Sequence, residues 1–173
     1  NPHLTKKEIE SELCRTLGTS KVIWIPGDPD ETGTDGHIDG IAAFIEPGRV
    51  LVEVNPDSSD PHYPVGKNNM EALKNIKDAK GRKLELEFIN EASYHPEVRD
   101  DECGSYINSY LANEAVVVPG YNANELERDF EAVETYQKIY PERTVVQVQI
   151  NDIAVGGGGI HCITQQQPNI TNC

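Results

Sequence analysis

The spacing of hydrophobic and polar residues near the start of the chain predicts an amphipathic helix. Thr5 stands three residues before Glu8, which is the pattern of a capping box at a helix N-terminus. Gly18 follows the last residue of the pattern, and glycine is a residue type that commonly ends helices. We therefore expect a helix over Lys6–Leu17.

The next part of the chain contains apolar β-type runs and one run with helical spacing. Turn residues separate the runs, most clearly Glu46-Pro47-Gly48-Arg49 and, after the helical run, Gly81. The first of these turns predicts an antiparallel hairpin. The expected elements are, in order, a strand at Lys21–Ile25, hairpin strands at Ile41–Ile45 and Val50–Val54, a helix that buries Met70, Leu73 and Ile76, and a strand at Leu84–Ile89.

The same order of hairpin, helix and strand then recurs, with a period of about 60 residues between lead strands near Lys21, Leu84 and Thr144. Units of this kind bury both faces only by packing on neighbouring units, so the repeat predicts a propeller-like α/β array. The second set consists of hairpin strands at Tyr106–Leu111 and Ala115–Val118, a helix opened by Asn122 and Glu125 with an apolar stripe of Leu126, Phe130 and Val133, and a strand at Val145–Ile150.

Composition narrows the class of protein. The chain has 173 residues, of which 37% are hydrophobic and 25% charged, which fits one folded domain. Its formal charge of -14 disfavours nucleic acid as a partner and favours cationic molecules, unless the acidic groups simply form a solvated surface. No apolar run approaches the roughly 20 residues of a membrane span. We expect a cytoplasmic protein, although the sequon at Asn169 leaves secretion open. A homo-oligomer also stays open.

His37 and Asp39 form the first candidate site. They are two residues apart, so on an extended strand their side chains project from the same face. An imidazole can move protons near neutral pH, and a carboxylate can bind a cation through two oxygens. The competing and commoner interpretation is that a histidine in a turn is structural.

Cys162 forms the second candidate site because it follows four glycines and His161. Glycine lets the backbone and the thiol come close to a bound molecule. The Lys and Ser/Thr that complete a phosphate-binding loop are missing after the glycines, and a tight bend with a buried cysteine is the structural alternative. His161 would point to the opposite face of an extended segment, so His37 is the better partner for Cys162.

A metal hydrolase is a rival hypothesis for these residues. His37, Asp39, His161 and Cys162 are all metal-ligand types, but their spacing matches no common zinc motif. The other cysteines, Cys14, Cys103 and Cys173, form no Cys-x-x-Cys pair with one another or with Cys162. We therefore expect no metal and no cofactor.

Three motifs resemble those of the agmatine deiminase family, and they occur in the family's order. With Asn1-Pro2-His3-Leu4, which resembles a further family stretch, they cover essentially the whole chain. The motifs are Asp30-Glu31-Thr32 with Thr34-Asp35-Gly36-His37-Ile38-Asp39-Gly40, then Ser105-Tyr106-Ile107-Asn108, and last Gly158-Gly159-Ile160-His161-Cys162-Ile163-Thr164-Gln165-Gln166-Gln167-Pro168.

The resemblance implies a fold and a set of roles. The fold is a pentein-type α/β propeller of five ββαβ repeats, of which residues 1–173 form about the C-terminal half of a single guanidine-deiminase domain. Cys162 is the implied nucleophile, His37 the general acid and base, and Asp39 the carboxylate that holds the guanidinium group. The further substrate-binding residues implied by the resemblance are Asp35, Asn108 and Gly159.

The implied reaction is hydrolysis of a guanidine to a ureido group and ammonia through a covalent cysteine intermediate. Agmatine is the expected small cationic substrate, with N-carbamoylputrescine as the product. Peptidylarginine, free arginine and a non-catalytic cation-binding role stay open. Because the family's enzymes are about twice as long, we expect the N-terminal half as a separate chain or a missing segment.

Overall fold

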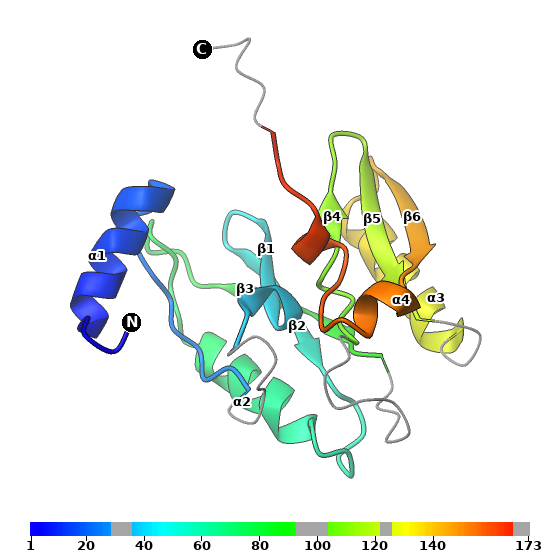
Figure 1. The fold of residues 1–173 in the computed structure, drawn as a ribbon, viewed down its shortest axis with the longest axis horizontal. Helices are drawn as coiled ribbons and strands as arrows, with labels where there is room; N and C mark the ends of the chain where they lie inside the picture. Colours follow the sequence, from blue (N-terminus) through cyan, green and yellow to red (C-terminus); the bar gives the residue numbers. More distant parts are fainter. Residues whose placement is uncertain (29–35, 93–103, 122–125, 168–173) are drawn as a thin grey trace.

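Two copies of one ββαβ unit form the body of the protein, seen side by side in Figure 1. The structure is a computed structural model that describes residues 1–28, 36–92, 104–121 and 126–167. The first unit consists of β1 (Ala42–Glu46), β2 (Arg49–Val54), α2 (Tyr63–Leu73) and β3 (Glu85–Asn90). The second consists of β4 (Tyr110–Leu111), β5 (Ala115–Gly120), α3 (Leu126–Ile139) and β6 (Thr144–Gln149).

The strand order is the same in both sheets. In the first, β1 is antiparallel to β2, and β2 is parallel to β3. In the second, β4 is antiparallel to β5, and β5 is parallel to β6. A hairpin turn can join the antiparallel pair, whereas the parallel pair needs a crossover, which α2 and α3 supply. The predicted repeat is therefore confirmed, although the two sheets do not close into a ring within the described residues.

Helix α1 (Lys6–Leu17) has the predicted bounds and the predicted cap. The backbone N–H of Glu8 donates to Thr5 Oγ1 at 3.3 Å, and the N–H of Thr5 donates to Glu8 Oε2 at 2.7 Å. Gly18 ends the helix in the left-handed conformation with φ 66°. The helix buries no residue and lies apart from both sheets in Figure 1, so its cap rather than core packing defines it.

The strand predicted at Lys21–Ile25 is wrong, because this segment joins neither sheet. Ile23 and Ile25 instead pack against the smaller core cluster under the first unit, which is built around Val52 and Leu73. An apolar run predicts that its side chains are buried, but a strand also needs a neighbouring backbone to pair with. Here the side chains are partly buried without a ladder of hydrogen bonds.

Two other predicted elements are shorter than expected. Helix α2 ends at Leu73, so Ile76 lies beyond it, and Gly81, whose φ is 79°, lies in the loop between Lys77 and Lys83, which form an isolated antiparallel bridge. Of the predicted strand at Tyr106–Leu111, β4 keeps only Tyr110–Leu111. Residues 106–108 form a buried turn whose polar groups bind side chains instead of a strand partner.

The buried face of α3 differs from the predicted stripe. Phe130 is 64% exposed, whereas Asp129, Ala132 and Tyr136 are at most 3% exposed. A buried carboxylate explains the difference: Asp129 Oδ1 accepts the hydroxyl of Tyr106 at 2.9 Å and the N–H of Tyr121 at 3.1 Å. The expected start of this helix, at Asn122 and Glu125, and the side chain of Leu126 lie outside the described residues.

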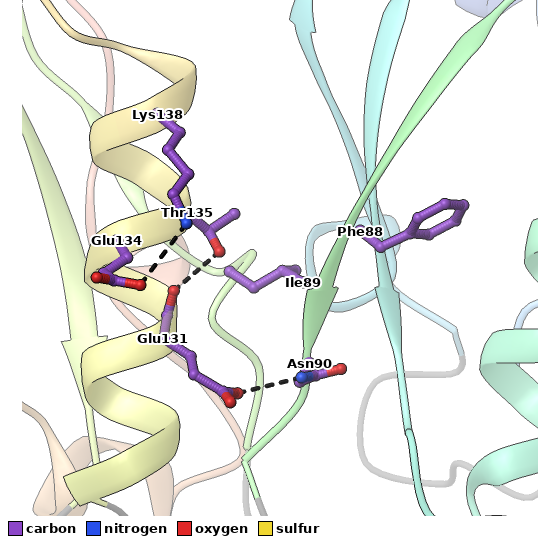
Figure 2. A pocket seen from close by; sticks show the side chains of 7 residues that line it. All are labelled: Phe88, Ile89, Asn90, Glu131, Glu134, Thr135 and Lys138. Carbon is purple, nitrogen blue, oxygen red and sulfur yellow. Dashed lines mark hydrogen bonds and ion pairs between the residues drawn. The ribbon is translucent and has the colours of Figure 1, made fainter.

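The two units meet where β3 faces α3, along a groove of about 170 Å³. Figure 2 shows Ile89 pointing toward the helix and Phe88 pointing away from it, as neighbours on a strand should. Asn90 Nδ2 donates to Glu131 Oε2 at 3.1 Å across the junction. The larger core cluster, around Leu51, Tyr106 and Val116, contains residues of both units.

The short remaining elements carry the polar motifs. One turn of 3₁₀ helix spans Ile38–Gly40, α4 spans Asn151–Ala154, and a second 3₁₀ turn spans His161–Ile163. Among the described residues, no helix has the length and apolar composition that crossing a bilayer requires.

Exchange of Asp129 for Ala should destabilise the chain, because the hydroxyl of Tyr106 and the N–H of Tyr121 would lose a buried acceptor. The expected loss is about 1–3 kcal/mol in the free energy of unfolding, measured by urea denaturation. Phe130→Ala on the same helix is the control, with an expected change within about 0.5 kcal/mol because the ring is exposed. A larger effect of Phe130→Ala than of Asp129→Ala would contradict the helix register.

Candidate active site

Cys162 lies in the 3₁₀ turn His161–Ile163 at the end of the glycine-rich segment, and it is a free, exposed thiol. Asn108 holds it from two sides. The side-chain Nδ2 of Asn108 donates to Cys162 Sγ at 3.2 Å, and the backbone N–H of Cys162 donates to Asn108 Oδ1 at 3.3 Å. The thiol is therefore oriented by an amide while it stays open to a reactant.

Asp39 approaches the same sulfur from the first unit. Its Oδ2 lies 3.5 Å from Cys162 Sγ and 2.6 Å from His161 Nδ1. The structure thus brings together Asp39, Asn108, His161 and Cys162, which come from three separated motifs of the sequence. A carboxylate beside a thiol can fix a cation next to the sulfur, and an imidazole on that carboxylate can set its orientation.

His161 was expected to point away from Cys162 if its segment were extended. These residues instead form a 3₁₀ turn, and His161 Nδ1 and Cys162 Sγ both lie within 3.5 Å of Asp39 Oδ2. His37 lies in the same region, with its Nδ1 4.0 Å from Asp39 Oδ1. Because Ile38–Gly40 is a 3₁₀ turn, the extended geometry predicted for His37 and Asp39 is wrong, although the two side chains are close.

Position 159 of this site requires glycine because a larger side chain would clash with Asn108, not because of its backbone angles. A Cβ atom on Gly159 would lie 2.5 Å from Asn108 Oδ1 and 2.7 Å from its Cγ, which are distances that atoms do not adopt. On Gly158 a Cβ would lie 3.3 Å from the Cβ of Cys162. The glycine run therefore lets the backbone pass against Asn108 and the cysteine. Asp35, the remaining predicted site residue, lies outside the described residues.

A pocket of about 240 Å³ opens beside these groups. Asp39, His161 and Ser109 supply polar atoms to its lining, and most of the rest is apolar. The apolar lining includes Phe44 and Leu111, which are 60% and 44% exposed on the two sheets. The pocket combines an apolar wall with a carboxylate at one end, a combination suited to a cation with a hydrocarbon tail.

The Ser105–Asn108 turn that carries Asn108 is fixed by a buried carboxylate on β2. Glu53, which is 7% exposed, accepts the hydroxyl of Ser105 at 2.9 Å and the backbone N–H of Tyr106 at 3.0 Å. From the second unit, Tyr136 donates its hydroxyl to the carbonyl of Tyr106 at 3.0 Å. Glu53 was not predicted from the sequence, although it is a lone acid in the apolar run of β2.

Burial dominates the electrostatics of Glu53. It raises the pKa of the Glu53 carboxyl well above its ordinary value of 4.5, and the negative charge of Glu91 raises that pKa further. The hydrogen bonds from Ser105 and from the backbone of Ile107 and Tyr106 act in the opposite direction but do not cancel the effect. The folded chain therefore keeps a proton on Glu53 at a pH where the unfolded chain has lost it.

Comparison with known proteins connects this site to a family. Relatives among solved structures share the fold: an agmatine deiminase of Enterococcus faecalis superimposes with a TM-score of 0.85 and 32% identity, over 97% of this chain and 50% of that one. An agmatine deiminase of C. jejuni, solved as a cysteine-to-serine variant with substrate bound, gives 0.78 and 26%, over 93% and 46%. The protein described here accordingly has a pentein-type α/β fold.

The family follows from the sequence match. The model of the Porphyromonas-type peptidyl-arginine deiminases matches residues 1–168, and the chain belongs to this family. A curated protein of Legionella pneumophila strain Paris, named as a candidate agmatine deiminase, is 40% identical over 168 residues. That match covers 97% of this chain and 48% of the relative, so the chain spans about half the length of the curated relatives it matches.

Exchange of Gly159 for Ala should slow alkylation of Cys162. The new methyl group would displace Asn108, and the sulfur would lose the N–H donor that orients it toward a reactant. We expect iodoacetamide to modify Cys162 roughly tenfold more slowly, the effect of losing about one hydrogen bond to a charged group. Peptide mass spectrometry measures this rate, with Cys14 on α1 as the internal reference.

The matched control for that variant is Gly104→Ala. A Cβ on Gly104 would meet Ala92 Cβ at 3.5 Å, which is an ordinary contact. Its Cys162 should react at the wild-type rate. An unchanged rate in Gly159→Ala would show that Asn108 does not act on the thiol.

Exchange of Glu53 for Gln should reduce the pH dependence of stability while keeping an acceptor for Ser105 and Tyr106. Because the folded-state pKa is raised, the folded chain binds more protons above pH 4.5, and its free energy of unfolding falls as pH rises through this range. Gln does not titrate, so this part of the decline should disappear in urea unfolding between pH 5 and about pH 8. Glu71→Gln, at an exposed position, should keep the wild-type slope; an equal slope in Glu53→Gln would refute the buried proton.

Proposed function

We propose that the complete protein hydrolyses a guanidine to a ureido group and ammonia, with agmatine as its substrate and N-carbamoylputrescine as its product. The observation that carries the proposal is the contact of Asp39 and Asn108 with Cys162, because it joins a cation-binding carboxylate to an oriented, exposed thiol. Family membership and the agmatine deiminases among the relatives support the same chemistry.

In the proposed first step, the Cys162 thiolate attacks the guanidinium carbon and forms a C–S bond. Asp39 accepts two N–H groups of the guanidinium and holds the carbon against the sulfur, which lies 3.5 Å from Oδ2. Asn108 donates to the sulfur and orients it. His37 protonates the departing nitrogen, so that ammonia leaves and an S-alkylthiouronium remains on Cys162.

In the second step, His37 removes a proton from water, which attacks the same carbon. The C–S bond breaks and Cys162 is regenerated as a thiolate, while the added hydroxyl group loses its proton to solvent and the neutral ureido product leaves. The C. jejuni relative solved with substrate bound is a cysteine-to-serine variant, which supports a reacting cysteine in this family. His161, 2.6 Å from Asp39, acts as a positioning residue that keeps the carboxylate aimed at the substrate.

The proposal includes the N-terminal half of the domain. The relatives are about twice as long as the matched region, and each of the two sheets leaves large apolar side chains uncovered. These include Phe88 on β3, and Val146 and Val148 on β6, all at least 43% exposed. We infer that the missing half covers such faces and supplies further groups that bind the substrate.

Peptidylarginine is the second candidate substrate, because the matching family model is named for peptidyl-arginine deiminases. The pocket beside Asp39 favours agmatine. Its volume of about 240 Å³ and its largely apolar wall suit a short aliphatic amine better than a peptide backbone with its polar groups.

The complete protein, with both halves, should release ammonia and a ureido product from agmatine faster than from arginine or a peptidyl-arginine. Cys162→Ser should lower turnover by about a thousandfold or more, as loss of an attacking nucleophile does. Cys14→Ser, on α1 away from the site, is the matched control and should keep wild-type turnover.

The covalent step has a separate readout. Acid quenching during turnover should trap the substrate's amidine on the Cys162 peptide, detected by mass spectrometry. Ureido formation by Cys162→Ser at the wild-type rate would refute the nucleophile. If the complete protein forms no ureido product from any of the three guanidines but still binds them, the protein is a cation-binding member of the family.

A further inference from the structure

Asp60, His62 and Glu91 form a second cluster of polar side chains, all of metal-ligand types, and the proposed deiminase reaction does not use it. Asp60 and His62 lie in the loop that enters α2, and Glu91 follows the last residue of β3. One ligand atom from each residue lies within 4.8 Å of the other two. Residues far apart in the sequence therefore present two carboxylates and an imidazole to one point.

The backbone holds one of these side chains in place. Asp60 Oδ1 accepts the backbone N–H of His62 at 2.8 Å, so the Asp60 carboxylate is fixed beside the backbone of His62. The N–H of Asp60 donates in turn to the carbonyl of Asp57 at 3.1 Å. The cluster is thus attached to a turn rather than to freely rotating chain.

Glu91 is held from the other side. Asn55, which is 8% exposed at the end of β2, donates its Nδ2 to Glu91 Oε1. His62 Nδ1 lies 4.0 Å from that same oxygen. Ligands of a tetrahedral ion at about 2.0–2.1 Å are about 3.3 Å apart, so a bound ion requires His62 and Glu91 to approach by less than about 1 Å.

The local charge also favours a cation. Asp28 and Asp60 both add negative charge at Glu91, and His62 is the group that opposes them there. Three carboxylates around one imidazole leave a net negative site even when the histidine is protonated. An ion pair between His62 and Glu91 alone would leave most of that charge uncompensated, whereas a divalent ion would balance it.

We propose that Asp60, His62 and Glu91 bind one divalent transition-metal ion, of which Zn²⁺ is the best match. An imidazole nitrogen with two carboxylate oxygens suits zinc, whereas calcium takes 6 to 8 oxygen ligands, a set these residues do not supply. Water completes the coordination. The ion ties the entrance of α2 to the end of β3, and this role is independent of the proposed reaction.

Calorimetric titration of the metal-free 173-residue chain with Zn²⁺ should give one equivalent bound and a raised midpoint of thermal unfolding. Glu91→Gln and His62→Asn should each weaken binding by about tenfold or more, since even loss of an outer partner of a ligand costs about 10–100-fold. Asp60→Asn should do the same. All three variants should match the wild-type unfolding midpoint in metal-free buffer, which separates loss of the site from loss of the fold.

Two matched controls separate this site from others. Glu71→Gln changes an exposed carboxylate on α2, and Cys162→Ser removes the thiol of the rival metal site; both should bind Zn²⁺ as the wild type does. Co²⁺ used as a probe should show visible d–d absorption without a thiolate charge-transfer band. Binding that survives Glu91→Gln and His62→Asn, or that disappears in Cys162→Ser, would overturn the proposal.

Discussion

The buried contact between Glu53 and the Ser105–Asn108 turn is the constraint on which the site depends. A carboxyl inside the core is costly unless it is hydrogen-bonded, and the turn donates a hydroxyl and a backbone N–H to Glu53 Oε2. The Ser105–Asn108 turn also needs the Glu53 carboxyl as an acceptor, because its backbone N–H groups have no strand partner. Each side fixes the other, so the polar contact also sets how the first unit sits against the second. The same contact fixes Asn108, which in turn positions Cys162 through two hydrogen bonds.

The exposed residues of the site contrast with this buried frame. Cys162 and His161 are open to solvent, and their positions are set by Asn108 and by the close-fitting glycines, which are themselves set from the core. Such an arrangement keeps reacting groups accessible without leaving them loose. Asp39 lies in the turn before β1 and Cys162 in the turn after α4, so the geometry depends on how the two units between them pack.

Much of the fold could be read from the sequence because its signals are local. The capping box fixes α1, and the alternation of hairpin and helix gives the order of elements in both ββαβ units, although β4 begins four residues later and α2 ends three residues earlier than predicted. The failures have physical causes that are not local. Lys21–Ile25 is apolar but pairs with no strand, and the burial of Asp129 in place of Phe130 depends on hydroxyl and amide donors from Tyr106 and Tyr121. Motif resemblance identified Asp39, Asn108 and Cys162 as neighbours, whereas the contact of His161 required knowing that its segment is a turn rather than extended.

The exposed face of β6 has a consequence for handling the chain. This strand is at the edge of its sheet, and Val146 and Val148 lie on it uncovered beside open backbone groups. Such an edge is a template on which another copy can add a strand, the first step of aggregation. The acidic charge of the chain counteracts this by repulsion between copies, which salt screens. Preparations of the chain by itself will therefore keep best at low ionic strength, in contrast to the usual practice of adding salt to improve solubility.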